Sequence, residues 1–144
     1  MSTLQRAIEI ATIAHKDQVD KAGKPYIDHP LRVMQAVEGE DAKIVAVLHD
    51  VLEDCPTFTL DYLRSEGFSQ EVLVALAHIT KTELDTYRAY IKRVSNNRLA
   101  TQVKLADLKD NSDLTRLGRE ITERDVRRIF RYAWATEYLE NVFW

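Results

Sequence analysis

The sequence has 144 residues and a formal net charge of −3, with 45% hydrophobic and 30% charged residues. This composition is that of an ordinary soluble globular protein, which excludes the fibrous and disordered classes. The negative charge gives no electrostatic case for a nucleic acid polymer as partner, because such binding needs clustered cations. The length corresponds most simply to one domain over residues 1–144, large enough to hold polar groups in a fixed interior.

The first apolar residues of the chain recur with helical spacing. After a cap at Ser2 or Thr3, one helical face carries Leu4, Ile8, Ala11 and His15. Residues 28–30, with the sequence Asp-His-Pro, then form a second helix start, because proline is well tolerated in the first turn of a helix. Both segments are therefore predicted to be helical.

A third helix is predicted over the apolar run that follows. Asp41 can cap this helix, which continues through Leu52. The pair Cys55-Pro56 ends it, since the residue before a proline is pushed out of the helical region.

The second half of the chain has the same character. Thr59 starts a short helix that stops at Gly67, and Ser69 opens another. Thr122 and Asp125 resemble a capping box before a last amphipathic helix. No segment alternates as a strand would, and no repeat or linker-like run interrupts the chain. We predict an all-α fold.

Cysteine usage and hydropathy indicate the compartment. Cys55 is the only cysteine, so no internal disulfide can form and a reducing compartment is the simpler assumption. Residues 1–10 carry charges where a signal peptide needs an unbroken apolar run, and no uncharged apolar stretch is long enough to span a bilayer. We expect a cytoplasmic protein without a membrane partner.

The most informative feature is the pair His49-Asp50, which stands in an otherwise apolar run and is followed at once by Glu53-Asp54. Residues four apart on a helix are neighbours, so His49 lies over Glu53 and Asp50 over Asp54. Such a polar end on a core helix predicts a cavity, and the interior of a helical bundle is where such helices build metal sites.

Two ligands do not complete a catalytic metal site, because a divalent ion needs three or four protein groups with one position left for water. The further candidates are His29 and Asp107, while Asp110 and Asp113 compete with Asp107 as the distant carboxylate. His15 is as readily a hydrogen-bonded core histidine as a ligand, so it is left out of the set. Imidazole with carboxylate suits Mn, Fe, Zn or Mg, and the carboxylate share favours a harder ion such as Mn.

Five segments, taken in order, resemble the hydrolase domain of RelA/SpoT-type enzymes, which belong to the HD superfamily of helical metal-dependent phosphohydrolases. The segments are AHKDQ (14–18), GKPYIDHPL (23–31), VLHDVLED (47–54), ITK (79–81) and VKLAD (103–107). They look most like the stand-alone form, the small alarmone hydrolases, and the resemblance runs from about residue 4 to about residue 140. It implies a single-domain helical bundle of the HD-domain type, and a hydrolase rather than a bifunctional enzyme.

The resemblance also implies a site. One divalent ion, typically Mn, would be held by four residues, which here match His29, His49, Asp50 and Asp107. The pair Glu53 and Asp54 would position and activate the attacking water. The implied reaction removes the 3′ pyrophosphate from guanosine tetra- or pentaphosphate alarmones, so a small-molecule nucleotide is the expected partner.

Four further residues are candidates for substrate binding. Lys21, Lys81 and Lys104 could reach phosphates as point cations, although lysines are usually solvated surface groups. Asn111 keeps the position that an asparagine has in the family.

Two departures from the family pattern affect the substrate. Asp20 stands where an arginine packs against the guanine base, and an aspartate cannot stack in that way. Asp110 replaces a histidine of the family. Two alternatives therefore stay open: an HD phosphohydrolase for a different nucleotide, and a nucleotide-binding regulatory module without turnover. Glu53 and Asp54 argue against the second, because binding alone needs no proton-handling pair.

Several aromatic residues remain outside this site. Tyr87 and Tyr90 are neighbours on a helix and could stack on a base, but core packing is the more common role of such residues. Trp144, at the end of the sequence, is a candidate subunit contact. Association of the protein into a homo-oligomer is therefore one of the alternatives.

Overall fold

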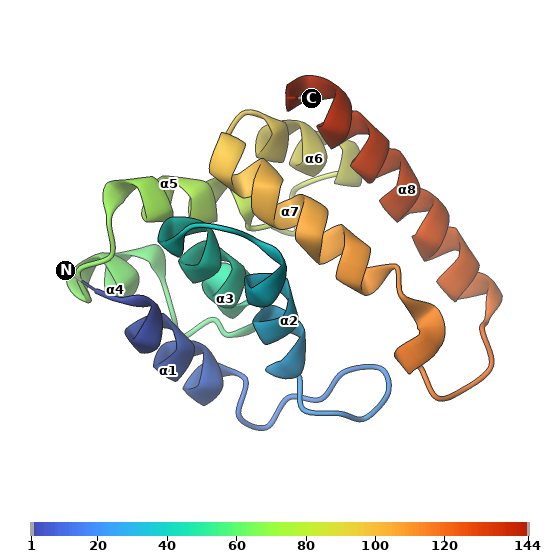
Figure 1. Cartoon of the computed structure of the whole chain (residues 1–144), viewed down its shortest axis with the longest axis horizontal. Coiled ribbons are helices and arrows are strands. Elements are labelled where there is room, and N and C mark those ends of the chain that lie inside the picture. Colours follow the sequence, from blue (N-terminus) through green and yellow to red (C-terminus); the bar gives the residue numbers. More distant parts are fainter. Residues whose placement is uncertain (1, 144) are drawn as a thin grey trace.

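The computed structural model describes residues 2–143, without the side chain of Phe143, and Trp144, the candidate subunit contact, lies outside the described residues. Within that part the chain is helical and contains no strand, which confirms the all-α prediction (Figure 1). The helices are α1 (Leu4–Ala14), α2 (Asp28–Ala36), α3 (Glu40–Asp54), α4 (Leu60–Ser65), α5 (Gln70–Ile79), α6 (Tyr87–Ser95), α7 (Arg98–Asn111) and α8 (Glu123–Phe143), with a short 3-10 helix η1 at Leu114–Arg116.

Most of the predicted helix starts are confirmed. The side chains of Thr3, Thr59 and Ser69 accept hydrogen bonds from backbone amides in the first turns of α1, α4 and α5. Thr122 and Asp125 form a reciprocal capping box at the start of α8, since each accepts a hydrogen bond from the other's backbone amide. These caps satisfy amides that have no partner within their own helix.

The predicted cap of the third helix is wrong. Asp41 lies within the first turn of α3, which begins at Glu40 and has no side-chain cap. The preceding residue is Gly39 with a φ of 95°, a left-handed conformation that glycine adopts without a steric penalty. The backbone turn at Gly39 therefore starts the helix one residue before Asp41. The other end is as predicted, because α3 stops at Asp54 and Cys55 follows it.

Helix α3 is the centre of the bundle and packs against α1, α2, α5 and α7. Its middle is apolar and fully buried, from Ile44 to Leu48, so that the polar residues at its end are carried into the interior. Helix α7 lies beside it and also contacts α2, α6 and α8. Helix α8 runs along the opposite side of the molecule from α1 (Figure 1).

Two surface segments flank the end of α3. The connection between α1 and α2, residues 15–27, is held by the bridge between Val19 and Pro25 and by hydrogen bonds that the Asp20 carboxylate accepts within the loop. The other flank is α8, whose residues Arg131 and Tyr132 line a cavity together with Glu53 of α3. In the part of the chain from residue 2 to 143, no helix combines the length and the apolar character needed to cross a membrane.

Candidate metal centre

Three helices bring four side chains together in the interior. His29 lies in the first turn of α2, His49 and Asp50 lie near the end of α3, and Asp107 lies on α7. One ligand atom from each of the four lies within 4.8 Å of all the others. His29, His49 and Asp107 are buried, and Asp50 is nearly so. The structure therefore assembles the four residues that the sequence singles out as metal ligands.

Asp107 lies between the two imidazoles. Its Oδ1 is 2.9 Å from Nε2 of His29 and 3.1 Å from Nε2 of His49. Oδ2 of Asp50 lies 3.5 Å and 3.3 Å from the same two nitrogens. Tyr26 donates a hydrogen bond of 2.7 Å from its hydroxyl to this oxygen of Asp50, which fixes the carboxylate. Two imidazole nitrogens and two carboxylates thus face one point.

Hydrogen bonds on the far side of each ring orient the imidazoles. Nδ1 of His49 donates to the carbonyl oxygen of Ala46 at 2.6 Å, and Nδ1 of His29 donates to Oδ2 of Asp110 at 2.7 Å. In both rings Nε2 is then the nitrogen that faces the cluster. A partner on the second nitrogen is the usual arrangement of histidines that bind metals.

The electrostatics of the cluster suit a cation. Burial alone would lower the pKa of both histidines, but the carboxylates around them raise the pKa of His29 to about 10 and that of His49 to about 9. The pKa of Asp107 is well below its usual value because Lys104 and the two imidazoles outweigh the effect of burial. In the metal-free protein, protons on the two imidazoles therefore balance the negative charge of the carboxylates. Two imidazole nitrogens with two carboxylates are a donor set that fits a divalent ion.

The structure distinguishes between the three candidate carboxylates of α7 and the segment after it. Asp107 reaches the cluster, where it also accepts hydrogen bonds from Lys104 Nζ at 2.8 Å and from Asn111 Nδ2 at 3.2 Å. Asp110 lies behind His29, outside the cluster. Asp113 is exposed and pairs with Arg116.

Glu53 and Asp54 lie beside the cluster and outside it. Glu53 is solvent-accessible, yet it is partly desolvated by the residues around it. This desolvation and the negative charge of the neighbouring Asp50 raise the pKa of its carboxyl to about 7. Partial desolvation by the surrounding protein likewise raises the pKa of the exposed Asp54, whose Oδ2 accepts a hydrogen bond from Gln18 at 3.1 Å. A carboxylate with a pKa near neutrality is suited to accept a proton from water.

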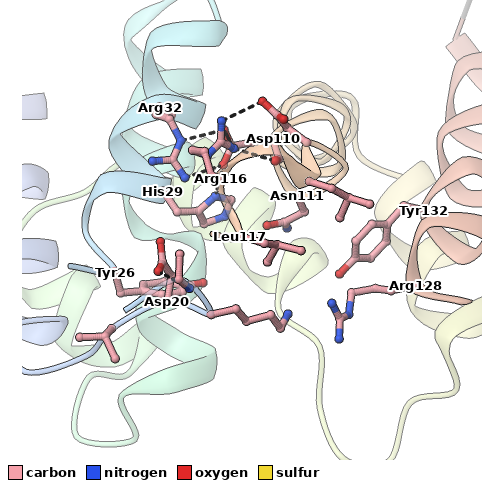
Figure 2. Close-up of a pocket in the computed structure, with 15 residues that line it drawn as sticks. Asp20, Tyr26, His29, Arg32, Asp110, Asn111, Arg116, Leu117, Arg128 and Tyr132 are labelled. Carbon is pink, nitrogen blue, oxygen red and sulfur yellow. Dashed lines mark hydrogen bonds and ion pairs between the residues drawn. The ribbon is translucent and has the colours of Figure 1, made fainter. Parts of the chain in front are cut away.

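Two cavities adjoin the centre, and the predicted substrate residues divide between them. Lys21 lines a cavity of about 370 Å³ with His29, Arg116 and Arg128. In Figure 2, Arg128 and Tyr132 lie on one side of this cavity, Arg32 and Asp110 lie on the other, and Asn111 is between them. Lys81 and Lys104 line a second cavity of about 410 Å³ with Glu53. Asn111 and Tyr132 line both.

Lys104 does not extend toward the solvent. Its ammonium is nearly buried, pairs with Asp107 and lies 5.2 Å from the centre of the Tyr90 ring. Tyr90 is buried, and its hydroxyl donates a hydrogen bond to the carbonyl oxygen of Ile79, which agrees with the interpretation of Tyr90 as a core residue. Tyr87 lines the second cavity, where the guanidinium of Arg131 covers its ring.

The residues that depart from the family pattern both have structural partners. Oδ1 of Asp20 accepts hydrogen bonds from the backbone amides of Ala22 at 2.8 Å and Lys24 at 2.9 Å, which closes the loop before α2. Asp110 holds His29 and also accepts from Arg32 and Arg116.

His15 lies outside the cluster. Its Nδ1 pairs with Gln18 at 2.8 Å, its ring packs on Tyr26, and its buried Nε2 has no hydrogen-bond partner within residues 2–143. Gln18 thereby connects His15 to Asp54.

Sequence reasoning missed several residues of the site. Tyr26 and Gln18 stand inside the segments that carry the resemblance, so their positions were already marked. Arg128 and Tyr132 reach the first cavity from α8, which is distant in sequence from every motif. The signal that could have found them is the run of arginines on one face of that helix.

No protein-family model matches the chain. It is 32% identical over 137 residues to a protein of Aquifex aeolicus named guanosine-3′,5′-bis(diphosphate) 3′-pyrophosphohydrolase, which covers 87% of the chain. It is also 34% identical over 120 residues, 74% of the chain, to a probable GTP pyrophosphokinase of Mycobacterium leprae. The chain resembles RelA/SpoT-type enzymes over most of its length. The bifunctional (p)ppGpp synthase/hydrolase SpoT of Escherichia coli is 27% identical over 121 residues, 75% of the chain.

These matches confirm the resemblance predicted from the five segments. The chain spans less than a fifth of the length of the relatives, between 15% and 19% of each of the three proteins named.

Proposed function

We propose that this protein is a metal-dependent nucleotide phosphohydrolase, and in its most specific form a guanosine 3′,5′-bis(diphosphate) 3′-pyrophosphohydrolase. The observation that carries the proposal is the convergence of His29, His49, Asp50 and Asp107 within 4.8 Å, beside a carboxyl whose pKa is near neutral. The name of the Aquifex aeolicus relative supports the substrate. Residues 1–144 would form one HD-type hydrolase domain.

The four clustered residues would hold one divalent ion, and we propose Mn because two carboxylates accompany the two imidazoles. When bound, such an ion lowers the pKa of water and screens the charge of a phosphate group. Asp110, Tyr26 and the carbonyl of Ala46 hold the ligands in place from outside.

The two acidic residues after the HD pair have separate roles in the proposal. Glu53 accepts the proton of the attacking water, since its pKa lies close to neutral pH. Asp54, held by Gln18, orients that water. In this scheme Lys81 and Lys104 neutralise the phosphate that reacts, Lys104 from its position at Asp107, while Lys21 and Asn111 bind the remainder of the nucleotide.

The remaining parts of the proposal concern the setting of the enzyme. A cytoplasmic location agrees with a nucleotide substrate and with the free thiol of Cys55. No nucleic acid polymer or membrane partner is proposed. Self-association stays a prediction, to be measured by sedimentation.

The test is a panel of nucleotides offered to metal-free protein reconstituted with Mn, Mg, Fe or Zn. We expect rapid release of pyrophosphate from guanosine 3′,5′-bis(diphosphate), highest with Mn and slight from other nucleotides. Asp50→Ala should abolish both metal content and turnover, whereas Glu53→Ala should lower turnover with the metal retained. Stoichiometric metal in Asp50→Ala protein would contradict the ligand assignment.

A second candidate is a phosphohydrolase for a different nucleotide. The observation that favours it is the use of Asp20, whose carboxylate closes a loop where the family has an arginine that packs on guanine. In the same panel, turnover of another nucleotide at a higher kcat/KM would support this candidate. Saturable binding with no product under any metal would instead support a regulatory module.

A further inference from the structure

His15 is a buried histidine to which the proposed function gives no role. The residue is 2% exposed, yet only one of its ring nitrogens has a partner. Nδ1 lies 2.8 Å from Oε1 of Gln18, whereas Nε2 is buried without a hydrogen-bond partner in residues 2–143. A buried polar atom without a partner costs free energy. What this histidine contributes by hydrogen bonding therefore goes through Nδ1 to Gln18.

The loop after α1 fixes the backbone of Gln18 beside this ring. The amide of Gln18 donates to the carbonyl oxygen of His15 at 3.0 Å, and its own carbonyl oxygen accepts from the amide of Tyr26 at 2.9 Å. The half-buried side chain of Gln18 starts from this fixed backbone and reaches from His15 to the end of α3.

The far end of the Gln18 side chain bonds to Asp54. Nε2 of Gln18 donates to Oδ2 of Asp54 at 3.1 Å, and among the described residues no other hydrogen bond reaches this exposed carboxylate. An exposed carboxylate without a partner samples several orientations, because the terminal torsion of aspartate is broad. Gln18 is therefore the group that restrains the carboxylate of Asp54.

The three side chains form a hydrogen-bond chain with one direction. An ionised carboxylate only accepts hydrogen bonds, so Gln18 turns its NH2 group toward Asp54 and its oxygen toward His15. Nδ1 of His15 then carries the proton that this oxygen accepts, whether the ring is neutral or charged. His15 thereby decides which way round the amide of Gln18 is held.

We propose that His15 is a positioning residue that orients the carboxylate of Asp54 through Gln18. This inference rests on the proposed function, in which Asp54 orients the attacking water beside the metal centre. A carboxylate held in one orientation keeps that water in place, and a misplacement of about 1 Å can cost about 100-fold in rate. The chain from His15 would thus act on kcat without contact between His15 and the substrate.

His15 also has a second contact that leads to the metal centre. Its ring packs on Tyr26, with ring centroids 5.0 Å apart, and the hydroxyl of Tyr26 holds the ligand Asp50. Loss of packing at Tyr26 would disturb a ligand and lower metal affinity. Loss of the bond to Gln18 would leave the metal in place and lower kcat. Metal affinity and kcat together therefore separate the two contacts.

The kinetic test replaces His15 by two residues of nearly the same shape. Asparagine and leucine are close to isosteric, but only asparagine has an amide nitrogen near the position of Nδ1 that can donate to Gln18. His15→Leu and Gln18→Leu should each lower kcat for guanosine 3′,5′-bis(diphosphate) by about tenfold or more, with little change in KM or metal affinity. His15→Asn should retain most of kcat. Equal kcat in His15→Leu and His15→Asn, or a loss of metal instead of kcat, overturns the inference.

A double variant and a matched control complete the kinetic test. The losses of kcat in His15→Leu/Gln18→Leu should not multiply, because both substitutions break the same chain. Losses that multiply would show that His15 acts apart from Gln18, against the inference. His78→Leu removes a histidine of α5 whose Nδ1 bonds within its own helix, to the carbonyl oxygen of Val74, and it should leave kcat unchanged.

A second readout needs no turnover. Nitrogen-15 NMR of the imidazoles in metal-free protein should show the proton of His15 at Nδ1, with a signal that changes in Gln18→Leu and not in His78→Leu. A neutral His15 ring with its proton at Nε2 overturns the chain even if the alarmone is hydrolysed. The expected tautomer with no nucleotide hydrolysed under any metal would keep the orienting pair and reject the proposed function.

Discussion

His29 donates a hydrogen bond from Nδ1 to Oδ2 of Asp110 at 2.7 Å, and this bond holds Nε2 of the same ring 2.9 Å from Oδ1 of Asp107. Asp110 is itself fixed by Arg32 and Arg116, which both donate to its carboxylate. A substitution that departs from the family pattern thus supports a ligand of the candidate metal centre.

Asp110→Ala should lower metal affinity by about 10- to 100-fold, the usual cost of losing a partner that orients a metal-binding histidine. Asp110→Asn should lower the metal affinity by a smaller factor, since the carbonyl oxygen of the asparagine can still accept a hydrogen bond from Nδ1 of His29. The measurement is a metal titration followed by calorimetry, with circular dichroism to verify folding. Asp113→Asn, at an exposed carboxylate, is the control. Equal affinity in Asp110→Ala and wild-type protein would remove Asp110 from the site.

Metal binding at pH 7 should release about two protons, because the carboxylates raise the pKa of His29 to about 10 and of His49 to about 9 in the metal-free protein. The check is calorimetry in buffers of different ionisation enthalpy. Release of no protons would contradict the pKa shifts.

The same pKa shifts of the two histidines determine how the stability of the metal-free protein depends on pH. The folded-state pKa values of His29 and His49 both lie above the ordinary histidine value of 6.5. The stabilisation of the folded protein by these two protonated histidines is therefore fully present below about pH 6.5. It is lost as pH rises through 9 to 10. Urea denaturation of metal-free protein should show this decline, and a stability that increases over that interval would reverse the expected sign.

Glu53→Gln should keep the metal and reduce kcat by about 10²- to 10⁴-fold, the range for loss of a general base. In the wild-type enzyme kcat/KM should rise with pH as Glu53 ionises. The midpoint should lie below the metal-free pKa of about 7, since a nearby cation favours the carboxylate. The variant should lose this rise. Glu83→Gln, an exposed acid in the connection before α6, is the control and should match wild-type protein in both respects.

Lys104→Met should destabilise the metal-free protein by about 3 to 5 kcal/mol, because it leaves the buried Asp107 without its ammonium partner. Lys109→Met removes an exposed lysine from the same helix and should change the free energy of unfolding little. Urea denaturation compares the two. If both variants unfold alike, Lys104 does not stabilise the centre through Asp107.

Much of the local structure could be predicted from the sequence because its causes are local. The caps at Thr3, Thr59 and Ser69 depend on a side chain and an amide within one turn. The one wrong cap, Asp41, shows the limit: a backbone turn at Gly39 decided where α3 begins.

The residues of the candidate site could be predicted where they lie on one helix or within the five segments that resemble RelA/SpoT-type hydrolase domains. The pairing of His49-Asp50 with Glu53-Asp54 follows from helical spacing, and His29 lies in a segment that carries the resemblance. The α8 arginines were not found, since spacing along α8 gives no information on which cavity that helix covers.

The sequence by itself determined that the chain is helical, which residues have metal-binding chemistry, and that the HD pair ends a buried helix. The family resemblance pointed to Asp107, but residue chemistry alone left Asp110 and Asp113 as alternatives, and only the tertiary structure decided which distant carboxylate completes the cluster. Asp107 is separated from His49 by 58 residues and from His29 by 78, and the rotation of α7 about its axis places it inward while Asp110 lies behind His29. That rotation follows from the packing of α7 against α2, α3 and α8 together, so no local pattern encodes it.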